Sequence, residues 1–110
     1  MKQREIWFAN LDPTQGSEQA GLRPVVIISG NMMNQNTGLC LACPLSTKIK
    51  RFPATIVISK NIQNGLTQDS EALIFQIRVL SHTRLVRRVG EISQQELNNM
   101  VLELNDIFEL

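Results

Sequence analysis

The most distinctive stretch of this 110-residue chain is Leu11-Asp12-Pro13-Thr14-Gln15-Gly16-Ser17-Glu18-Gln19-Ala20-Gly21-Leu22-Arg23-Pro24. It is a long polar loop between two short apolar runs, Ile6-Trp7-Phe8-Ala9 and Val25-Val26-Ile27-Ile28, which predict two strands. The loop ends in one arginine whose backbone is restricted by the proline after it. A simple linker needs no such chemistry, so we expect this loop to carry functional residues.

Short strands separated by turns account for the rest of the first 90 residues. The candidate strands are 4–9, 24–29, 39–43, 54–59, 71–75, 77–80 and 88–92. Turn signals lie between them, among them Asn34-Gln35-Asn36-Thr37-Gly38 and the stretch from Asn61 to Gly65. Several runs are apolar on both faces, which is typical of a closed or doubly covered sheet. The spacing therefore predicts a small β-barrel or sandwich.

The period of the apolar residues changes at the end of the chain. Ser93-Gln94-Gln95-Glu96 is a capping box with Ser93 at the N-cap. After it, apolar residues recur at helical spacing on one face: Leu97, Met100, Val101, Leu104 and Phe108. We expect an amphipathic helix over 93–110 that packs across a barrel formed by 1–92, in one domain spanning 1–110.

Composition places the chain among folded proteins, with 43% hydrophobic and 19% charged residues. The longest apolar runs have four or five residues, far below the about 20 that a membrane span needs. The start, Met1-Lys2-Gln3-Arg4-Glu5, lacks the apolar region of a signal peptide. We therefore expect a cytoplasmic protein with no membrane partner.

Charge is distributed unevenly although the formal net charge is only +1. Residues 1–90 hold all eleven Lys and Arg and five of the ten acids, whereas residues 91–110 hold the other five acids and no base. A basic body beside an acidic tail suits a polyanion bound on one face. The alternative for the tail is that its acids line the solvated side of a helix.

The loop closely resembles the signature of the MazF/PemK/Kid toxins, small bacterial endoribonucleases of type II toxin–antitoxin pairs. The matching residues are Leu11-Asp12-Pro13-Thr14, Gly16-Ser17-Glu18-Gln19, Gly21 and Arg23-Pro24. Two later segments are also similar to the family: Cys43-Pro44-Leu45-Ser46-Thr47 and Gln76-Ile77-Arg78-Val79-Leu80. The resemblance covers essentially the whole chain. It implies a mainly β fold, the SH3-like small barrel of CcdB/MazF-like toxins, with a C-terminal α-helix.

The resemblance also implies an activity and partners. The family members are homodimeric mRNA interferases that cleave single-stranded RNA (mRNA, rRNA or tRNA) at short motifs, without metal or cofactor. A cognate antitoxin blocks them by laying a segment along the RNA groove. Cleavage without metal uses the ribose 2′-OH as nucleophile and leaves a 2′,3′-cyclic phosphate and a 5′-OH. Such chemistry needs a proton acceptor, a group that stabilises the added negative charge, and a proton donor.

Arg23 suits the charge-stabilising role, because a guanidinium fork matches phosphate oxygens. Arginine stays protonated at neutral pH and is a poor general base. The resemblance implies that Arg23 pairs with Ser46 and takes part in acid–base work. We therefore assign Arg23 to charge stabilisation and proton donation, and Ser46 to hydrogen bonding with the phosphate or the attacking hydroxyl. The neighbouring Thr47 could take the role of Ser46 instead.

A second catalytic pattern, found in the Kid-like branch of the family, is absent. Ser17 stands in place of its histidine, Leu73 in place of its arginine and Phe75 in place of its aspartate. The pattern that remains is the MazF-like arginine plus Thr/Ser. Glu18 is then either a base or an ion-pair partner that orients Arg23, and we favour the ion pair.

Other residues are candidates for RNA binding rather than chemistry. Ser17 and Gln19 lie in the signature loop, and the resemblance places Gln76 and Arg78 along the groove. Lys48, Lys50 and Arg51 form a basic loop after Ser46, which would add salt-dependent affinity. Aromatic residues are few, and Phe52 is the best candidate for base stacking, whereas Trp7 is expected in the core.

Two further signals are set aside. Cys40 and Cys43 form C-x-x-C, but residues three apart on a strand point to opposite faces, and no second pair exists to complete a zinc site. They are expected as buried reduced thiols. His82 is expected in a surface turn; a phosphate contact is the alternative.

Two rival functions remain open at this point. One is a DNA gyrase poison of the CcdB type, which shares the barrel but needs no Arg-Pro loop with an aligned hydroxyl. The other is a non-catalytic family member that only binds RNA or an antitoxin, which the serine at position 46 and the phenylalanine at position 75 leave possible.

Overall fold

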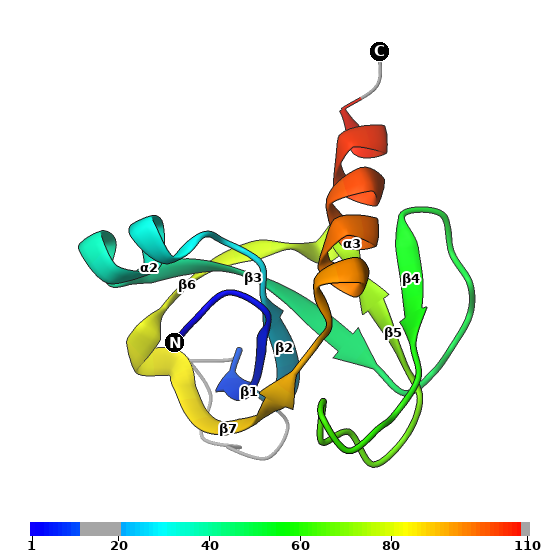
Figure 1. Cartoon of the computed structure of the whole chain (residues 1–110), viewed down its shortest axis with the longest axis horizontal. Helices are drawn as coiled ribbons and strands as arrows, with labels where there is room; N and C mark the ends of the chain where they lie inside the picture. The colour runs from blue at the N-terminus through cyan, green and yellow to red at the C-terminus, as the bar shows by residue number, and fades with distance from the viewer. Residues whose placement is uncertain (12–20, 109–110) are drawn as a thin grey trace.

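The structure, a computed structural model, describes residues 1–11 and 21–108 (Figure 1). Seven strands, two α-helices and two 3-10 turns follow one another in those residues. In chain order they are β1 (Glu5–Asn10), β2 (Leu22–Ile27), α2 (Asn31–Thr37), β3 (Leu39–Ser46), β4 (Thr55–Ile58), β5 (Ser70–Leu73), η1 (Ile74–Gln76), β6 (Arg78–Ser81), η2 (His82–Arg84), β7 (Leu85–Glu91) and α3 (Gln94–Ile107).

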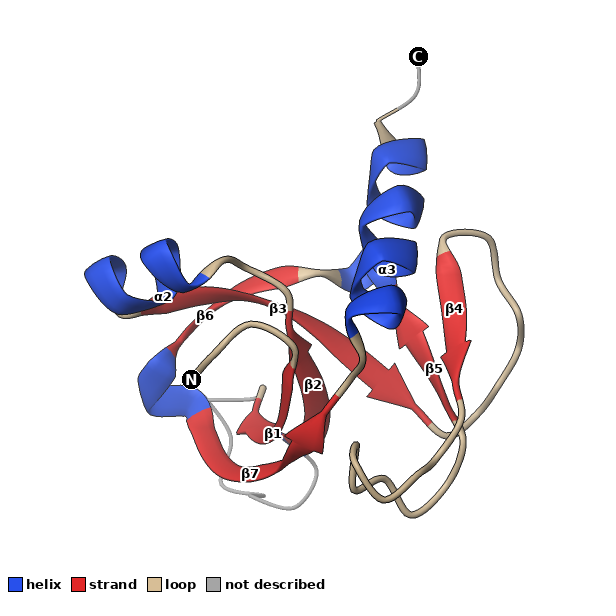
Figure 2. Ribbon diagram, in the orientation of Figure 1, coloured by secondary structure: helices blue, strands red, loops and turns tan. Residues whose placement is uncertain are grey.

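The strands form one antiparallel sheet in the order β4-β5-β3-β2-β1-β7, with β6 also paired to β3. The eight-residue β3 is central because it changes partner along its length. Leu39 to Ala42 pair with β6, whereas Leu45 and Ser46 pair with β5. Figure 2 shows the strands curving around a common interior, with α3 at one side. The predicted mainly β fold with a C-terminal helix is confirmed.

Two apolar clusters fill the two faces of this sheet, which explains the runs that are apolar on both faces. Along β3 the side chains alternate between the clusters, as strand geometry requires. Cys43 and Leu45 pack in the larger cluster, together with residues of β1, β2, β4 and α3. Cys40 and Ala42 pack in the smaller cluster, against which Trp7 is partly buried. Trp7 is thus at the edge of the core, and its Nε1 donates to Glu5 Oε1 at 3.0 Å.

The C-terminal helix begins at the predicted cap. Glu96 N donates to Ser93 Oγ at 3.1 Å and Ser93 N donates to Glu96 Oε1 at 2.9 Å, which completes the capping box. Leu97 and Met100 are buried against the larger cluster. Within the described ranges, no helix is long and apolar enough to cross a membrane.

Only part of the apolar stripe of α3 packs on the barrel. The expectation that Val101 and Phe108 pack on the barrel was wrong: their side chains are 42% and 71% exposed. The first turns of the helix contact β4 and η1, and the remaining turns project beyond the barrel (Figure 1). Leu104 is the last stripe residue that packs on the core.

The segment before β3 is a helix, not the turn that its asparagines indicated. Helix α2 ends at Gly38, which adopts the left-handed conformation (φ 70°) typical of a helix C-cap. Asn34 is buried and its Nδ2 donates to the Ser29 carbonyl at 3.0 Å. A second correction concerns 71–75, where the strand ends at Leu73 and the chain turns through η1.

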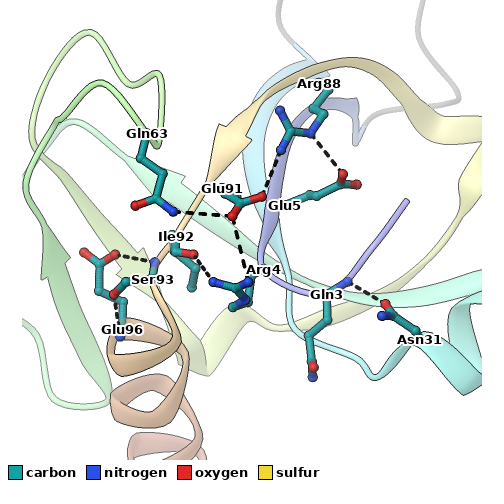
Figure 3. A network of polar contacts seen from close by, with 10 residues as sticks. All are labelled: Gln3, Arg4, Glu5, Asn31, Gln63, Arg88, Glu91, Ile92, Ser93 and Glu96. Carbon is teal, nitrogen blue, oxygen red and sulfur yellow. Dashed lines mark hydrogen bonds and ion pairs between the residues drawn. The ribbon is translucent and has the colours of Figure 1, made fainter.

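A polar network ties the N-terminal strand to the last strand and to the start of α3 (Figure 3). Arg88 binds Glu5 Oε2 through Nε at 2.9 Å and Glu91 Oε1 through Nη2 at 3.1 Å. Arg4, with a positive φ of 79°, donates from Nη1 to the Ile92 carbonyl at 3.1 Å. Glu91 and Arg88 therefore serve the fold, and part of the acidic tail is ion-paired rather than merely solvated.

Candidate active site

Three polar residues form a row across neighbouring strands. In the β2–β3 ladder Val25 pairs with Pro44, and continuing this register by two residues places Arg23 across from Ser46. On the other side of β3, Ser46 pairs with Glu71 of β5. Residues opposite one another in an antiparallel ladder share a face. Ser46 and Glu71 are thus a cross-strand pair, and the extended register would set Arg23 in line with them.

Three neighbouring surface hollows beside these residues share lining residues with one another, and together they are here named the Arg23 groove. One hollow is lined by Arg23, Pro24, Leu45, Ser46, Thr47 and Lys48. A second is lined by Leu11, Arg23, Pro44, Leu73, Gln76 and Arg78. The third is lined by Ser46, Lys48, Lys50, Phe52, Glu71, Leu73, Phe75 and Gln76. Eight of the candidate residues named from sequence thus lie in one groove: Arg23, Ser46, Thr47, Lys48, Lys50, Phe52, Gln76 and Arg78.

The hydroxyl of Ser46 is oriented by its own chain. Lys48 N donates to Ser46 Oγ at 3.1 Å, in a turn that follows the end of β3. A hydroxyl that accepts this bond keeps its own proton for another acceptor. The turn-cap role considered for Ser46 therefore exists, and it leaves Ser46 able to donate into the groove. Thr47 is exposed on the same wall.

Positive charge dominates the groove. Arg23, Lys48, Lys50 and Arg78 all line it. Glu71 is the one acid among the described lining residues. Its carboxylate oxygens already have hydrogen-bond donors within the protein. The Thr55 hydroxyl lies 2.6 Å from Oε2, Lys50 N donates to Oε1 at 2.9 Å and Phe52 N donates to Oε2 at 3.2 Å. The groove therefore presents its cations to a ligand, which suits a chain of phosphates.

The hydrogen bonds to Glu71 also set its protonation. The Thr55 hydroxyl first, then the Lys50 N–H, lower the pKa of this carboxyl below its ordinary value, against the opposing effect of burial. Glu71 therefore stays ionised at neutral pH although its side chain is only 1% exposed.

Some candidates lie elsewhere. Arg51 is exposed and is absent from the described lining of all three hollows. Ser17, Glu18 and Gln19 lie outside the described residues.

The histidine and the two cysteines that were set aside in the sequence analysis lie outside the described groove lining and have structural surroundings of their own. His82 lies exposed in η2, with Nδ1 3.0 Å from the Gly38 carbonyl. Cys40 and Cys43 are free thiols in opposite clusters, as expected. In the part of the chain that the structure describes, no three His, Cys, Asp or Glu side chains gather so as to hold a metal ion.

Sequence reasoning missed Glu71 and Phe75 as groove residues. The available signal was Glu71 itself, a lone charge inside the run Ser70-Glu71-Ala72-Leu73-Ile74. A charge within a buried strand needs partners. Its partners lie about 16 to 21 positions earlier in the chain, so the sequence alone does not indicate them.

The fold is shared with solved toxins. MazF from Deinococcus radiodurans superposes with a TM-score of 0.80 over 100% of this chain and 97% of its own, at 23% identity. A MazE–MazF complex from the same organism gives 0.77, with coverage of 100% and 96% and 20% identity. These likenesses place the chain in the class of small β-barrel proteins with the MazF fold.

Sequence comparison then identifies the family. Residues 2–108 match the family described as PemK-like, MazF-like toxin of type II toxin–antitoxin system. The endoribonuclease toxin MazF of Escherichia coli K12 is 37% identical over 101 residues, which cover 91% of this chain and 86% of that protein. The endoribonuclease MazF9 of Mycobacterium tuberculosis is 34% identical over 103 residues, with coverage of 88% and 86%. The chain belongs to the PemK/MazF-like toxin family.

Proposed function

We propose that this chain is the toxin of a toxin–antitoxin pair and an endoribonuclease that cuts single-stranded RNA at a short sequence motif without metal. The 2′-OH releases its proton to solvent as its oxygen attacks the adjacent phosphorus, the bond from phosphorus to the 5′-oxygen breaks, and the departing 5′-oxygen takes up a proton. The products carry a 2′,3′-cyclic phosphate and a 5′-OH, with no net change in protons. The observation that supports the proposal is that Arg23 and Ser46, from the neighbouring strands β2 and β3, line the same basic hollow.

Arg23 would stabilise the charge that develops on the phosphate. Its guanidinium is exposed at the junction of two of the three hollows, where it can meet two phosphate oxygens at once. The same group can give a proton to the departing 5′-oxygen. Pro24 restricts the backbone of Arg23, so less freedom is lost when the substrate binds.

Ser46 would hydrogen-bond the phosphate or the attacking hydroxyl. The bond from Lys48 N orients its oxygen and leaves its hydroxyl proton free to donate to the substrate. Lys48, Lys50 and Arg78 would neutralise phosphates on either side of the cut. Gln76 and Phe52 would contact bases. The family relation extends the RNA-contact proposal to Ser17, Glu18, Gln19 and Arg51.

Protein partners follow from the same family relation. Among the structural neighbours is a mycobacterial endoribonuclease in complex with its cognate antitoxin, with a TM-score of 0.76, 20% identity and coverage of 96% and 92%. We propose that this chain binds an antitoxin over its groove and acts in the cytoplasm as a homodimer of one 110-residue domain. Exposed apolar side chains on α3 support a protein interface there: Val101, Leu102, Ile107 and Phe108.

The test is cleavage of a long single-stranded RNA in EDTA by the wild type, by Arg23→Ala and by Lys60→Ala. Lys60 is an exposed lysine that lies outside the described lining of the groove, so it controls for loss of one positive charge. Discrete fragments with 5′-OH ends from the wild type and Lys60→Ala, missing with Arg23→Ala, are expected. The mapped ends give the motif.

Contrary outcomes are equally clear. Cleavage by Arg23→Ala at the parental rate would remove Arg23 from the mechanism. RNA left intact by the wild type would overturn the nuclease proposal in favour of a binding-only protein or a gyrase poison, which a gyrase pull-down would separate.

A further inference from the structure

A second site adjoins the cleavage residues. Phe52, in the loop after β3, and Phe75, in η1, meet edge to face with ring centroids 6.2 Å apart and planes at 77°. Both rings are 47% exposed, and Pro53 completes an apolar cleft between them. Contiguous exposed apolar surfaces rimmed by polar residues mark sites of interaction or ligand binding. The cleft is continuous with the Arg23 groove, because both rings also line the hollow that contains Ser46.

The loop that carries Phe52 is held in place rather than loosely exposed. Glu71 accepts from the backbone N–H groups of Lys50 and Phe52, and the Thr55 hydroxyl lies 2.6 Å from both a Glu71 carboxylate oxygen and the Phe52 carbonyl, to either of which it can donate. The loop also contains two non-glycine residues with positive φ, Arg51 at 56° and Ala54 at 61°. Such backbone is disfavoured for residues other than glycine and persists only where surrounding contacts determine it.

We infer that the Phe52–Phe75 cleft binds one unstacked base of the RNA, next to the phosphate that is cut. The inference rests on the proposed function and names a subsite for it. Single-stranded RNA is read by splaying bases out and stacking them on aromatic rings. The charges around the cleft suit the same ligand: Lys50 Nζ lies 5.8 Å from the Phe52 ring centroid, and Lys48 lines the adjoining hollow. An apolar side chain of a protein would fill the cleft but would leave these lysines without phosphates.

The subsite would position the substrate as well as bind it. A base held against the exposed surfaces of the two rings restrains the nucleotide beside Ser46, and restraint of this kind favours an in-line attack geometry. Glu71 acts through the loop, so it is a positioning residue and not a catalytic one. Preference among bases would follow from how each fills the space between Phe52, Pro53 and Phe75.

The experiment measures binding of a fluorescein-labelled oligonucleotide that carries the mapped motif, with a 2′-deoxy sugar at the cut nucleotide so that it stays intact. A series of such probes lacks one base at a time. The proteins are wild type, Phe75→Ala, Phe75→Leu and the control Ile62→Ala, whose fully exposed side chain lies outside the cleft. Melting temperatures verify that each variant is folded.

We expect Phe75→Ala to weaken binding roughly fivefold to a hundredfold, the range for loss of one base–aromatic stack, with a smaller loss for Phe75→Leu and none for Ile62→Ala. One abasic position should weaken wild-type binding by a similar factor and leave Phe75→Ala binding unchanged. Non-additive losses of this kind identify the removed base as the one that contacts Phe75 in the cleft.

Other results would overturn the inference. Suppose that the wild type cuts RNA and that Phe75→Ala binds every probe as tightly as the wild type does. The cleft is then not a base subsite. The same conclusion follows if the losses from Phe75→Ala and from each abasic position simply add. If the wild type cuts no RNA, the proposed function fails first, and this inference fails with it.

Discussion

Ser46 of β3 lies directly across from Glu71 of β5, so the hydroxyl of the proposed site and the carboxylate that holds the neighbouring loop form one cross-strand pair. Opposed residues of this kind have Cβ atoms about 5 Å apart. Glu71 bonds to the loop at 47–54 and to Thr55 after it, and Ser46 accepts a bond from Lys48 N at the start of the same loop. A change at Glu71 should therefore reach the groove through the loop as well as through the strand pair.

Glu71→Gln should lower the free energy of unfolding by about 2 kcal/mol at neutral pH, because buried donors lose a charged acceptor. Since folding lowers the pKa of Glu71, the stabilisation is complete above the ordinary glutamate pKa of about 4.3 and is lost as pH falls through the lower folded-state value. Urea unfolding from pH 7 to pH 3 should show the gap between the two proteins constant above about pH 5 and shrinking below it.

The matched control is Asp69→Asn. Asp69 is exposed and accepts one bond, from Lys60 N at 2.9 Å, so the change should cost less than about 0.5 kcal/mol. A Glu71→Gln protein as stable as Asp69→Asn at neutral pH would show that the carboxylate does not hold the loop.

Ser46→Ala should lower kcat about a hundredfold with little change in KM, because it removes a donor that acts on the reacting phosphate. Ser46→Thr keeps the hydroxyl and should restore most of the rate, while Thr47→Ala should stay within about threefold of wild type. Rates on a short RNA that contains the mapped motif decide this. If Thr47→Ala shows the large loss and Ser46→Ala does not, the two hydroxyls exchange roles.

Local patterns in the sequence predicted those elements whose causes are local. The capping box at Ser93 and Glu96 and the stripe residues Leu97 and Met100 lie within a few positions of one another, and the structure has the helix where they indicated. The strand predicted over 39–43 likewise placed Cys40 and Cys43 on opposite faces. In each case the conformation of the segment is determined by residues that are close to one another in the sequence, so a local pattern predicts it.

The features that the sequence did not predict depend on tertiary contacts between distant segments. Helix α2 forms from a segment with turn-like composition, and its buried Asn34 bonds to Ser29 outside the helix. The exposure of Phe108 depends on where the barrel ends, which no helical period encodes. For the groove, a motif drew attention to Arg23 and Ser46, but the partners of Glu71 become neighbours only once β3, β4 and β5 pair.

Gly90→Ala should destabilise the fold by roughly 3 kcal/mol. A Cβ at Gly90 would lie 2.4 Å from the Asn64 carbonyl carbon and oxygen and 2.6 Å from the Gln63 oxygen, and backbone atoms cannot easily move away. Gly30→Ala is the control, since nothing lies within 4 Å of its Cβ, and it should cost less than about 1 kcal/mol. Equal urea midpoints for the two variants would mean that the turn at 61–65 does not pack tightly on β7.

Cys40 and Cys43 should both resist alkylation in the folded protein at pH 8. Burial raises the pKa of Cys43 to about 12 and raises that of Cys40 above its ordinary value, so neither thiol forms the reactive thiolate. Mass spectrometry after iodoacetamide should find no adduct on native protein and two after unfolding in guanidinium. Rapid native labelling of Cys40 would show that the smaller cluster opens readily.

The salt dependence of RNA binding should separate the groove lysines from other surface charges. For single strands the slope of log K against log salt is about −0.7 for each neutralised phosphate. Lys48→Ala and Lys50→Ala should each reduce the magnitude of the slope by about 0.7, with a probe that carries the 2′-deoxy sugar so that cleavage does not intervene. Lys60→Ala, outside the described lining of the groove, should leave the slope unchanged. Equal slopes for all three variants and the wild type would move the phosphate path away from Lys48 and Lys50, and with it the assignment of the Arg23 groove as the RNA site.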